Sequence, residues 1–173
     1  TGFQTLDGYF TCAEMEPEHA SMHYSERLLP LPGLGVAYSC PSIPPVVGRS
    51  ALGLPEQGTL MLMPQSLFKV HPQMDALMAE VLAACPHAHL VLFDLLPQFR
   101  QPFERRLRRS LSQHEVDPAR LIWLTGCDRE RYLQINMACD VMLDSLHFSG
   151  GNTSLDAFQA GLPVLSSEGK FMR

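Results

Sequence analysis

The stretch ACDVMLDSLHFSGGNTSLDAFQAGLPVLS, residues 138–166, contains two short apolar segments separated by a glycine turn and an amphipathic segment. Asp140–Leu143 and Pro163–Ser166 are predicted strands, and Thr153–Ala160 is a predicted helix. Gly161 follows that helix, at the position where a residue in the left-handed conformation commonly ends a helix. Strand, helix and strand in this order predict a βαβ unit with parallel strands.

The same alternation extends upstream to Thr59. The further predicted strands are Thr59–Met63, His89–Leu95 and Leu121–Leu124, and the further predicted helices are Pro72–Cys85, Pro102–His114 and Asp128–Ala138. The strands are nearly all apolar, which is typical of strands buried on both faces. We therefore predict an α/β domain over residues 58–173, in which right-handed crossovers place helices on both faces of a parallel sheet.

The segment before this domain has a different character. It is rich in proline, which removes a backbone donor and fixes φ, so long helices are not expected there. We predict an irregular linker segment over residues 1–57, with short extended pieces at Gly8–Cys12 and Gly35–Tyr38. The chain has no initiating Met and no signal peptide, so we expect it to be a piece of a longer or processed protein.

Composition limits the class of protein. Apolar residues make up 46% and charged residues 18% of the 173 residues, as in a globular domain. No apolar stretch reaches the roughly 20 residues that span a bilayer, so no membrane partner is expected. The formal net charge of −5 argues against a nucleic acid partner. The basic cluster Arg105–Arg109 is predicted to be a solvated helix face.

Cysteine usage and the absence of common motifs narrow the chemistry. The five cysteines are odd in number and form no CxxC pair, which argues against a disulfide framework or a zinc site and favours a reducing cytoplasm. No GxGxxG follows the first predicted strand of the domain, and P-loop, HExxH and GxSxG motifs are absent from the sequence. No zinc site and no dinucleotide cofactor are therefore predicted.

Polar residues follow several of the predicted strands. Open parallel sheets bind ligands beyond the carboxyl ends of their strands, so these loops form the candidate site. The first loop offers Gln65, Ser66 and Lys69, and a second offers Thr125, Gly126, Cys127, Arg129 and Tyr132. Each has a structural alternative when taken alone: Lys69 as a surface lysine, and Tyr132 as a packed ring.

The glycine turn is the most informative loop. It consists of Gly150, Gly151, Asn152, Thr153 and Ser154 and leads directly into a predicted helix. Glycines allow close backbone approach, and free N–H groups at a helix N-terminus attract anions, so a diphosphate is a fitting ligand. The alternative is a tight turn with an N-cap. His147, in the same loop, is assigned no role.

Several ordered segments together resemble the O-GlcNAc transferase family, above all its bacterial members that often carry tetratricopeptide repeats. The matching segments are residues 138–144, 150–158 and 160–164, with Tyr24–Leu28, Leu31–Gly35, Pro64–Lys69 and Glu168–Arg173. The resemblance implies a Rossmann-like parallel sheet with helices on both faces, corresponding to the C-terminal, donor-binding lobe of a GT-B glycosyltransferase.

The resemblance also implies an activity. This is inverting transfer of a sugar from UDP-GlcNAc to Ser or Thr of a polypeptide acceptor, without a metal. Two alternatives stay open: a UDP-glucose-dependent protein glycosyltransferase, and a non-catalytic nucleotide-binding or protein-interaction module. The family places its general base in another lobe, so none is assigned here and the chain alone is expected to be inactive.

Roles for individual residues follow from the same resemblance. Lys69 would stabilise the leaving UDP, with Gln65 or Ser66 at the diphosphate and the turn at 150–154 donating to the phosphates. The further implied contacts are Arg129 and Tyr132 near the uridine, the Thr125–Cys127 backbone at the uracil edge, and Asp156 beside the ribose. The chain departs from animal relatives in two places: Tyr132 replaces a histidine, and Gly151-Asn152 replaces a His-Thr pair.

Overall fold

The computed structural model describes residues 2–169, and these form two compact units. The larger unit runs from Cys40 to Ser167, and the smaller one is made by the segments on either side of it. Among the described residues, no helix combines the length and the apolar character that crossing a membrane requires. Because the candidate site lies within the larger unit, that unit carries the functional argument.

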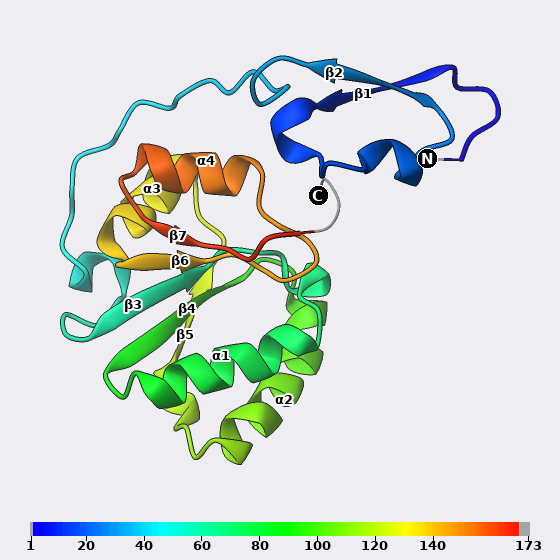
Figure 1. The fold of residues 1–173 in the computed structure, drawn as a ribbon. Helices are drawn as coiled ribbons and strands as arrows, with labels where there is room; N and C mark the ends of the chain where they lie inside the picture. The colour runs from blue at the N-terminus through cyan, green and yellow to red at the C-terminus, as the bar shows by residue number, and fades with distance from the viewer. Residues whose placement is uncertain (1, 170–173) are drawn as a thin grey trace. The chain divides into compact units, whose positions relative to one another are not determined.

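A parallel sheet of five strands forms the centre of the larger unit (Figure 1). The strands are β3 (Thr59–Met63), β4 (Ala88–Asp94), β5 (Leu121–Thr125), β6 (Val141–Leu143) and β7 (Val164–Leu165). Their spatial order is β5-β4-β3-β6-β7, and every neighbouring pair is parallel. The chain thus moves outward from β3 through β4 to β5, then returns to place β6 on the other side of β3. This reversal creates a topological switch point between β3 and β6.

Helices cover both faces of this sheet (Figure 1). They are α1 (Gln73–Ala84) and α2 (Pro97–Gln113) on one face, and α3 (Arg129–Ala138) and α4 (Asn152–Gln159) on the other. Alternating strand residues feed two separate cores: Met61 and Met63 pack with the α1–α2 side, and Leu60 and Leu62 with the α3–α4 side. The predicted fold is confirmed, because these strands are apolar on both faces and need a helical layer on each side.

Helix α2 begins earlier than the sequence predicts. The prediction used Pro102 as the first helical residue, whereas the helix starts at Pro97 and contains Pro102 in its interior. Pro97 occupies the first turn, where a missing N–H is not needed. A proline is tolerated further on at the cost of one backbone hydrogen bond. The other predicted elements of the domain lie within two residues of those observed.

The domain boundary also differs from the prediction at residue 58. Residues 40–57 belong to the larger unit because they contribute buried side chains and hydrogen bonds to it. Leu52 and Leu54 lie in the core on the α3–α4 side. The Arg49 guanidinium donates to the Gly58 and Ala138 carbonyls at 2.9 and 3.0 Å and pairs with Asp140 at 2.8 Å. The contacts with Ala138 and Asp140 span about 90 positions of sequence and leave no local pattern to recognise.

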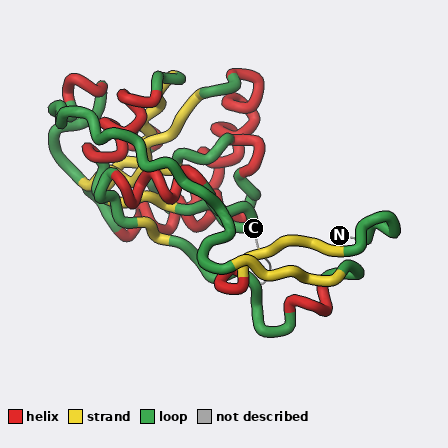
Figure 2. Tube along the Cα trace, turned by 90° about the horizontal axis from the view of Figure 1, so that it is seen from above, coloured by secondary structure: helices red, strands yellow, loops and turns green. Residues whose placement is uncertain are grey.

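The smaller unit contains two parallel strands, β1 (Gly8–Cys12) and β2 (Arg27–Leu31), which run side by side in Figure 2. The first extended piece was predicted correctly. The second was predicted wrongly at Gly35–Tyr38, whereas the observed strand is Arg27–Leu31 and includes Pro30. A proline cannot donate to a ladder but is accepted in an edge strand. Residues 170–173, part of a segment that resembles the family, lie outside the described residues.

Candidate functional site

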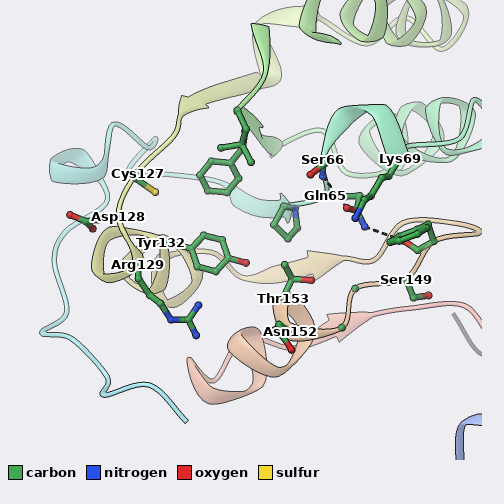
Figure 3. A pocket seen from close by; sticks show the side chains of 16 residues that line it. Gln65, Ser66, Lys69, Cys127, Asp128, Arg129, Tyr132, Ser149, Asn152 and Thr153 are labelled. Carbon is green, nitrogen blue, oxygen red and sulfur yellow. Dashed lines mark hydrogen bonds between the residues drawn. The ribbon is translucent and has the colours of Figure 1, made fainter. Parts of the chain in front are cut away.

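A pocket of about 590 Å³ lies at the carboxyl ends of the strands (Figure 3). The loops after β3, β5 and β6 line it, together with the end of β4. Its lining residues are Pro64, Gln65, Ser66, Lys69, Phe93, Leu95, Cys127, Asp128, Arg129, Tyr132, Phe148, Ser149, Gly150, Gly151, Asn152 and Thr153. This is the switch point of the sheet, the place where an open α/β sheet binds its ligand.

Lys69 and the glycine turn line this one pocket, as the sequence predicts. Lys69 ends a short 3-10 helix, Leu67–Lys69, that follows β3, and the turn follows the neighbouring strand β6. The lysine Nζ lies 4.3 Å from the centroid of the Phe148 ring and 5.8 Å from that of Phe68. Among the described residues, no carboxylate forms an ion pair with Lys69. Its charge is therefore available to an anion.

Helix α4 begins at this end of the pocket. Gly151 precedes its first residue, Asn152, and the Ser154 hydroxyl donates to the Gly150 carbonyl at 3.1 Å. A side chain at Gly150 would collide with its neighbours, since a Cβ there would lie 2.3 Å from Thr153 Oγ1 and 2.8 Å from Ser154 Oγ. The turn thus places amides and hydroxyls close together at a positive helix end, which suits a phosphate.

Asp144, at the end of β6, shapes the glycine turn. Its Oδ1 accepts from the backbone N–H groups of Ser145 and Gly150 at 3.0 and 2.8 Å, and its Oδ2 accepts from the Ser166 hydroxyl at 2.7 Å. The carboxylate therefore holds Ser145 and Gly150, the two ends of this loop, in place. The loop is held in shape by the protein before any ligand arrives.

Gln65 connects the two loops. Its Nε2 donates to Ser145 Oγ at 3.2 Å and to the Phe148 carbonyl at 3.1 Å, and its Oε1 accepts from the Ser66 N–H at 3.0 Å. The resemblance implied that Gln65 or Ser66 meets the diphosphate. Both residues line the pocket, but the amide of Gln65 is engaged in joining the loops. The Gln65 side chain thus stabilises the arrangement of the two loops that line the pocket.

At the opposite end of the pocket, one wall is aromatic and apolar. Tyr132, on α3, packs its ring against Phe93 with centroids 5.8 Å apart, and Leu95 and Cys127 lie in the same wall. The Tyr132 hydroxyl oxygen itself is buried. Burial, the largest cause, raises the pKa of Tyr132 to about 12, so the hydroxyl stays neutral at physiological pH. This wall suits the flat ring of a base.

Arg129 lines the pocket close to Tyr132 and is held by Asp156. Its guanidinium contacts both carboxylate oxygens of Asp156, at 3.0 and 2.6 Å. Asp156 is buried, with 3% of its surface exposed, while the Arg129 side chain is 55% exposed. The buried carboxylate therefore orients the exposed guanidinium.

Four predicted site residues do not line the pocket. They are Thr125, Gly126, Ser154 and Asp156, each of which lies within two or three positions of a residue that does. Prediction missed six lining residues: Pro64, Phe93, Leu95, Asp128, Phe148 and Ser149. For Pro64, Asp128, Phe148 and Ser149, the position in a loop after a predicted strand was a usable signal, whereas Phe93 and Leu95 lie within the predicted strand His89–Leu95. Asp128 additionally caps α3, where its carboxylate accepts from the Arg131 N–H at 2.8 Å.

The two ends of the pocket differ in chemistry. Lys69 and the glycine turn offer positive charge and N–H donors, and the Tyr132 wall offers aromatic and apolar surface. A ligand with a flat ring at one end and a diphosphate at the other matches both. Together with the switch-point location, these features are those of a Rossmann-like domain with a ligand pocket, the architecture of one lobe of a GT-B glycosyltransferase.

Comparison with known proteins gives the family. The model of glycosyl transferase family 41 matches residues 35–171, and the chain belongs to this family. A tomato (Solanum lycopersicum) protein described as probable UDP-N-acetylglucosamine–peptide N-acetylglucosaminyltransferase SPINDLY is 26% identical over 98% of this chain. The chain spans only 18% of the length of that relative.

Solved structures agree on the fold. A mutant of the Thermobaculum terrenum O-GlcNAc transferase superimposes with a TM-score of 0.78 and 27% identity, over 96% of this chain and 31% of that one. Sucrose-phosphate synthase from Thermosynechococcus elongatus superimposes with a TM-score of 0.63 over 91% of this chain and 40% of that one. The latter is only 18% identical and shows the shared fold alone.

Proposed function

We propose that this chain binds the donor in a protein O-glycosyltransferase that transfers a sugar from UDP-GlcNAc to Ser or Thr. The observation that carries this proposal is the presence of Lys69 and the glycine turn in one pocket with an aromatic wall opposite. Membership of glycosyl transferase family 41 supports the reaction class. The description of the tomato relative supports UDP-GlcNAc as donor and a peptide as acceptor.

In the proposed reaction, the acceptor oxygen attacks the anomeric carbon while the bond from that carbon to the β-phosphate oxygen breaks. Attack from the opposite side inverts the anomeric centre. The acceptor proton passes to a general base outside this chain, and the leaving UDP gains negative charge. Lys69 and the amides at Gly151–Thr153 stabilise that charge, which is the role of a metal in other enzymes.

Calorimetric titration tests the donor site. UDP and uridine are titrated onto the wild-type chain and onto Lys69→Ala and Lys69→Arg variants. Loss of a charge-assisted contact should weaken UDP about tenfold or more in Lys69→Ala, with little change for uridine. Lys69→Arg should retain most of the affinity because it keeps the charge. Equal losses for UDP and uridine in Lys69→Ala would contradict the assigned role.

Turnover by the whole protein separates enzyme from binding module. Transfer to a peptide is measured with UDP-GlcNAc and with UDP-glucose, with and without a chelator. We expect transfer by the whole protein, none by this chain alone, and no loss with the chelator. Binding of UDP without transfer would favour a non-catalytic module, and a strong preference for UDP-glucose would change the assigned donor.

We also propose that the protein is located in the cytoplasm. All five cysteines are free thiols in the structure, as a reducing compartment would keep them. Localisation of the tagged whole protein, by fractionation, checks it.

A further inference from the structure

The Lys69 ammonium lies over an aromatic face. Its Nζ is 4.3 Å from the Phe148 centroid, which is within the range of a cation–π contact. The Phe68 ring is farther away, at 5.8 Å. Both rings are partly open to solvent, with Phe148 47% and Phe68 54% exposed. Phe148 therefore makes the closer contact and itself lines the pocket.

The Lys69 side chain must be ordered if its ammonium is to bind an anion in the pocket. Its four-carbon stem is flexible, and ordering it costs conformational entropy. A carboxylate partner would hold the ammonium but would also compete with an anionic ligand for it. An aromatic face attracts the ammonium without cancelling its charge. Because the ring covers one side of the ammonium, N–H donors on the other side stay available to a phosphate.

Phe148 is itself fixed to the loop that carries Lys69. Its carbonyl accepts from the Ser145 hydroxyl at 2.7 Å and from Gln65 Nε2 at 3.1 Å. Gln65 lies four positions before Lys69 in the same loop. This hydrogen bond joins the backbone of Phe148 to the loop that carries Lys69, so the ring and the ammonium keep their relative positions.

We propose that Phe148 is a positioning residue for Lys69, holding the ammonium at the anion end of the pocket before and after a nucleoside diphosphate binds. This inference rests on the proposed function, because it assumes that Lys69 contacts phosphate. The ring lowers the entropic cost of binding and remains in contact with the ammonium in the complex. Its removal should therefore weaken UDP but leave uridine unchanged.

NMR tests the contact in the ligand-free chain. Protons above an aromatic face are shifted upfield, so the ε-methylene protons of Lys69, assigned with a Lys69→Arg variant, should resonate upfield of those of the other lysine. The shift should vanish in Phe148→Leu, remain in Phe148→Tyr and Phe68→Leu, and persist in wild type saturated with UDP. Absence of the shift in wild type, or its loss when UDP binds, would overturn the inference.

Calorimetry tests the consequence with the same variants. Phe148→Leu should weaken UDP about two- to fivefold, the size of a solvent-exposed cation–π contact, without changing uridine affinity. Phe148→Tyr should bind UDP as wild type does, and Phe68→Leu serves as the matched control at the more distant ring. Failure of wild type to bind UDP would overturn the proposed function. Binding that is equally tight in Phe148→Leu would overturn only the role of Phe148.

Discussion

Arg129 reaches Asp156 with both terminal nitrogens of its guanidinium, across 27 positions of sequence, at 3.0 and 2.6 Å. The pair joins the first residue of α3 to the middle of α4. Because the carboxylate is buried and the guanidinium is half exposed, the two partners are not equivalent. The buried partner depends more on the pair than the exposed one does.

We therefore expect Arg129→Ala to destabilise the chain more than Asp156→Asn. The first change leaves a buried carboxylate without this partner, at a cost of about 1–3 kcal/mol, and the second removes the buried charge itself. Urea unfolding measures both free energies. A larger loss for Asp156→Asn would show that the carboxylate is not the dependent partner.

Gly150→Ala should weaken UDP binding. A Cβ at this position would displace the Thr153 and Ser154 hydroxyls, which lie 2.3 and 2.8 Å from it. Loss of one or two hydrogen bonds predicts a roughly fivefold or greater decrease in UDP affinity. Gly151→Ala is the matched control, because a Cβ there has no neighbour within 4 Å among the described residues. If calorimetry shows equal losses in the two variants, crowding at Gly150 is not the cause.

Tyr132→Ala should weaken uridine itself, because the ring forms the wall against which a base would pack. Tyr132→Phe keeps the ring and removes only the hydroxyl, so its affinity should lie closer to that of wild type. Base–aromatic stacking predicts a loss of about fivefold or more for the alanine variant. Uridine titrations give both values, and unchanged uridine affinity in Tyr132→Ala would remove this residue from the site.

Stability should fall in mild acid because of His89 in β4. Burial, with a smaller contribution from the Arg120 charge, lowers the pKa of His89 below its ordinary value of 6.5. The folded state therefore binds this proton less tightly than the unfolded state. The stability associated with neutral His89 is present above about pH 6.5 and is lost as the pH falls from there toward the folded pKa.

The comparison of wild type with His89→Gln at pH 7.5 and pH 5.5 isolates this effect. Wild type should lose more unfolding free energy between the two pH values than the variant, which has no imidazole to protonate. Urea midpoints at each pH provide the measurement. Parallel pH dependence in the two proteins would mean that other groups cause the acid sensitivity.

Local pattern was sufficient to predict most of the larger unit. Continuous apolar runs such as His89–Leu95 and helical spacing in Pro72–Cys85 identified the elements, and their alternation identified a parallel sheet. Local pattern failed at two elements that contain a proline. The start of α2 was misplaced because Pro102 lies inside the helix, and β2, which contains Pro30, was not predicted. In each case tertiary packing outweighed the local preference of one residue.

Prediction of the site was less complete for a related reason. Loops after parallel strands meet at one edge, so Lys69 and Gly150–Thr153 could be placed together from order alone. The sequence could not show what each polar group would contact. Gln65 joins two loops, and Asp156 orients Arg129, and both contacts involve partners far away in the chain.

The order of strands, helices and glycine turn is thus encoded locally, because hydrophobic periodicity and backbone permissiveness are properties of neighbouring residues. Only the tertiary structure decided that Phe148 would lie beneath the Lys69 ammonium and that Leu52 and Leu54 would complete a core. Such contacts depend on how separate segments pack, and many different pairs of side chains would have fitted the same local pattern.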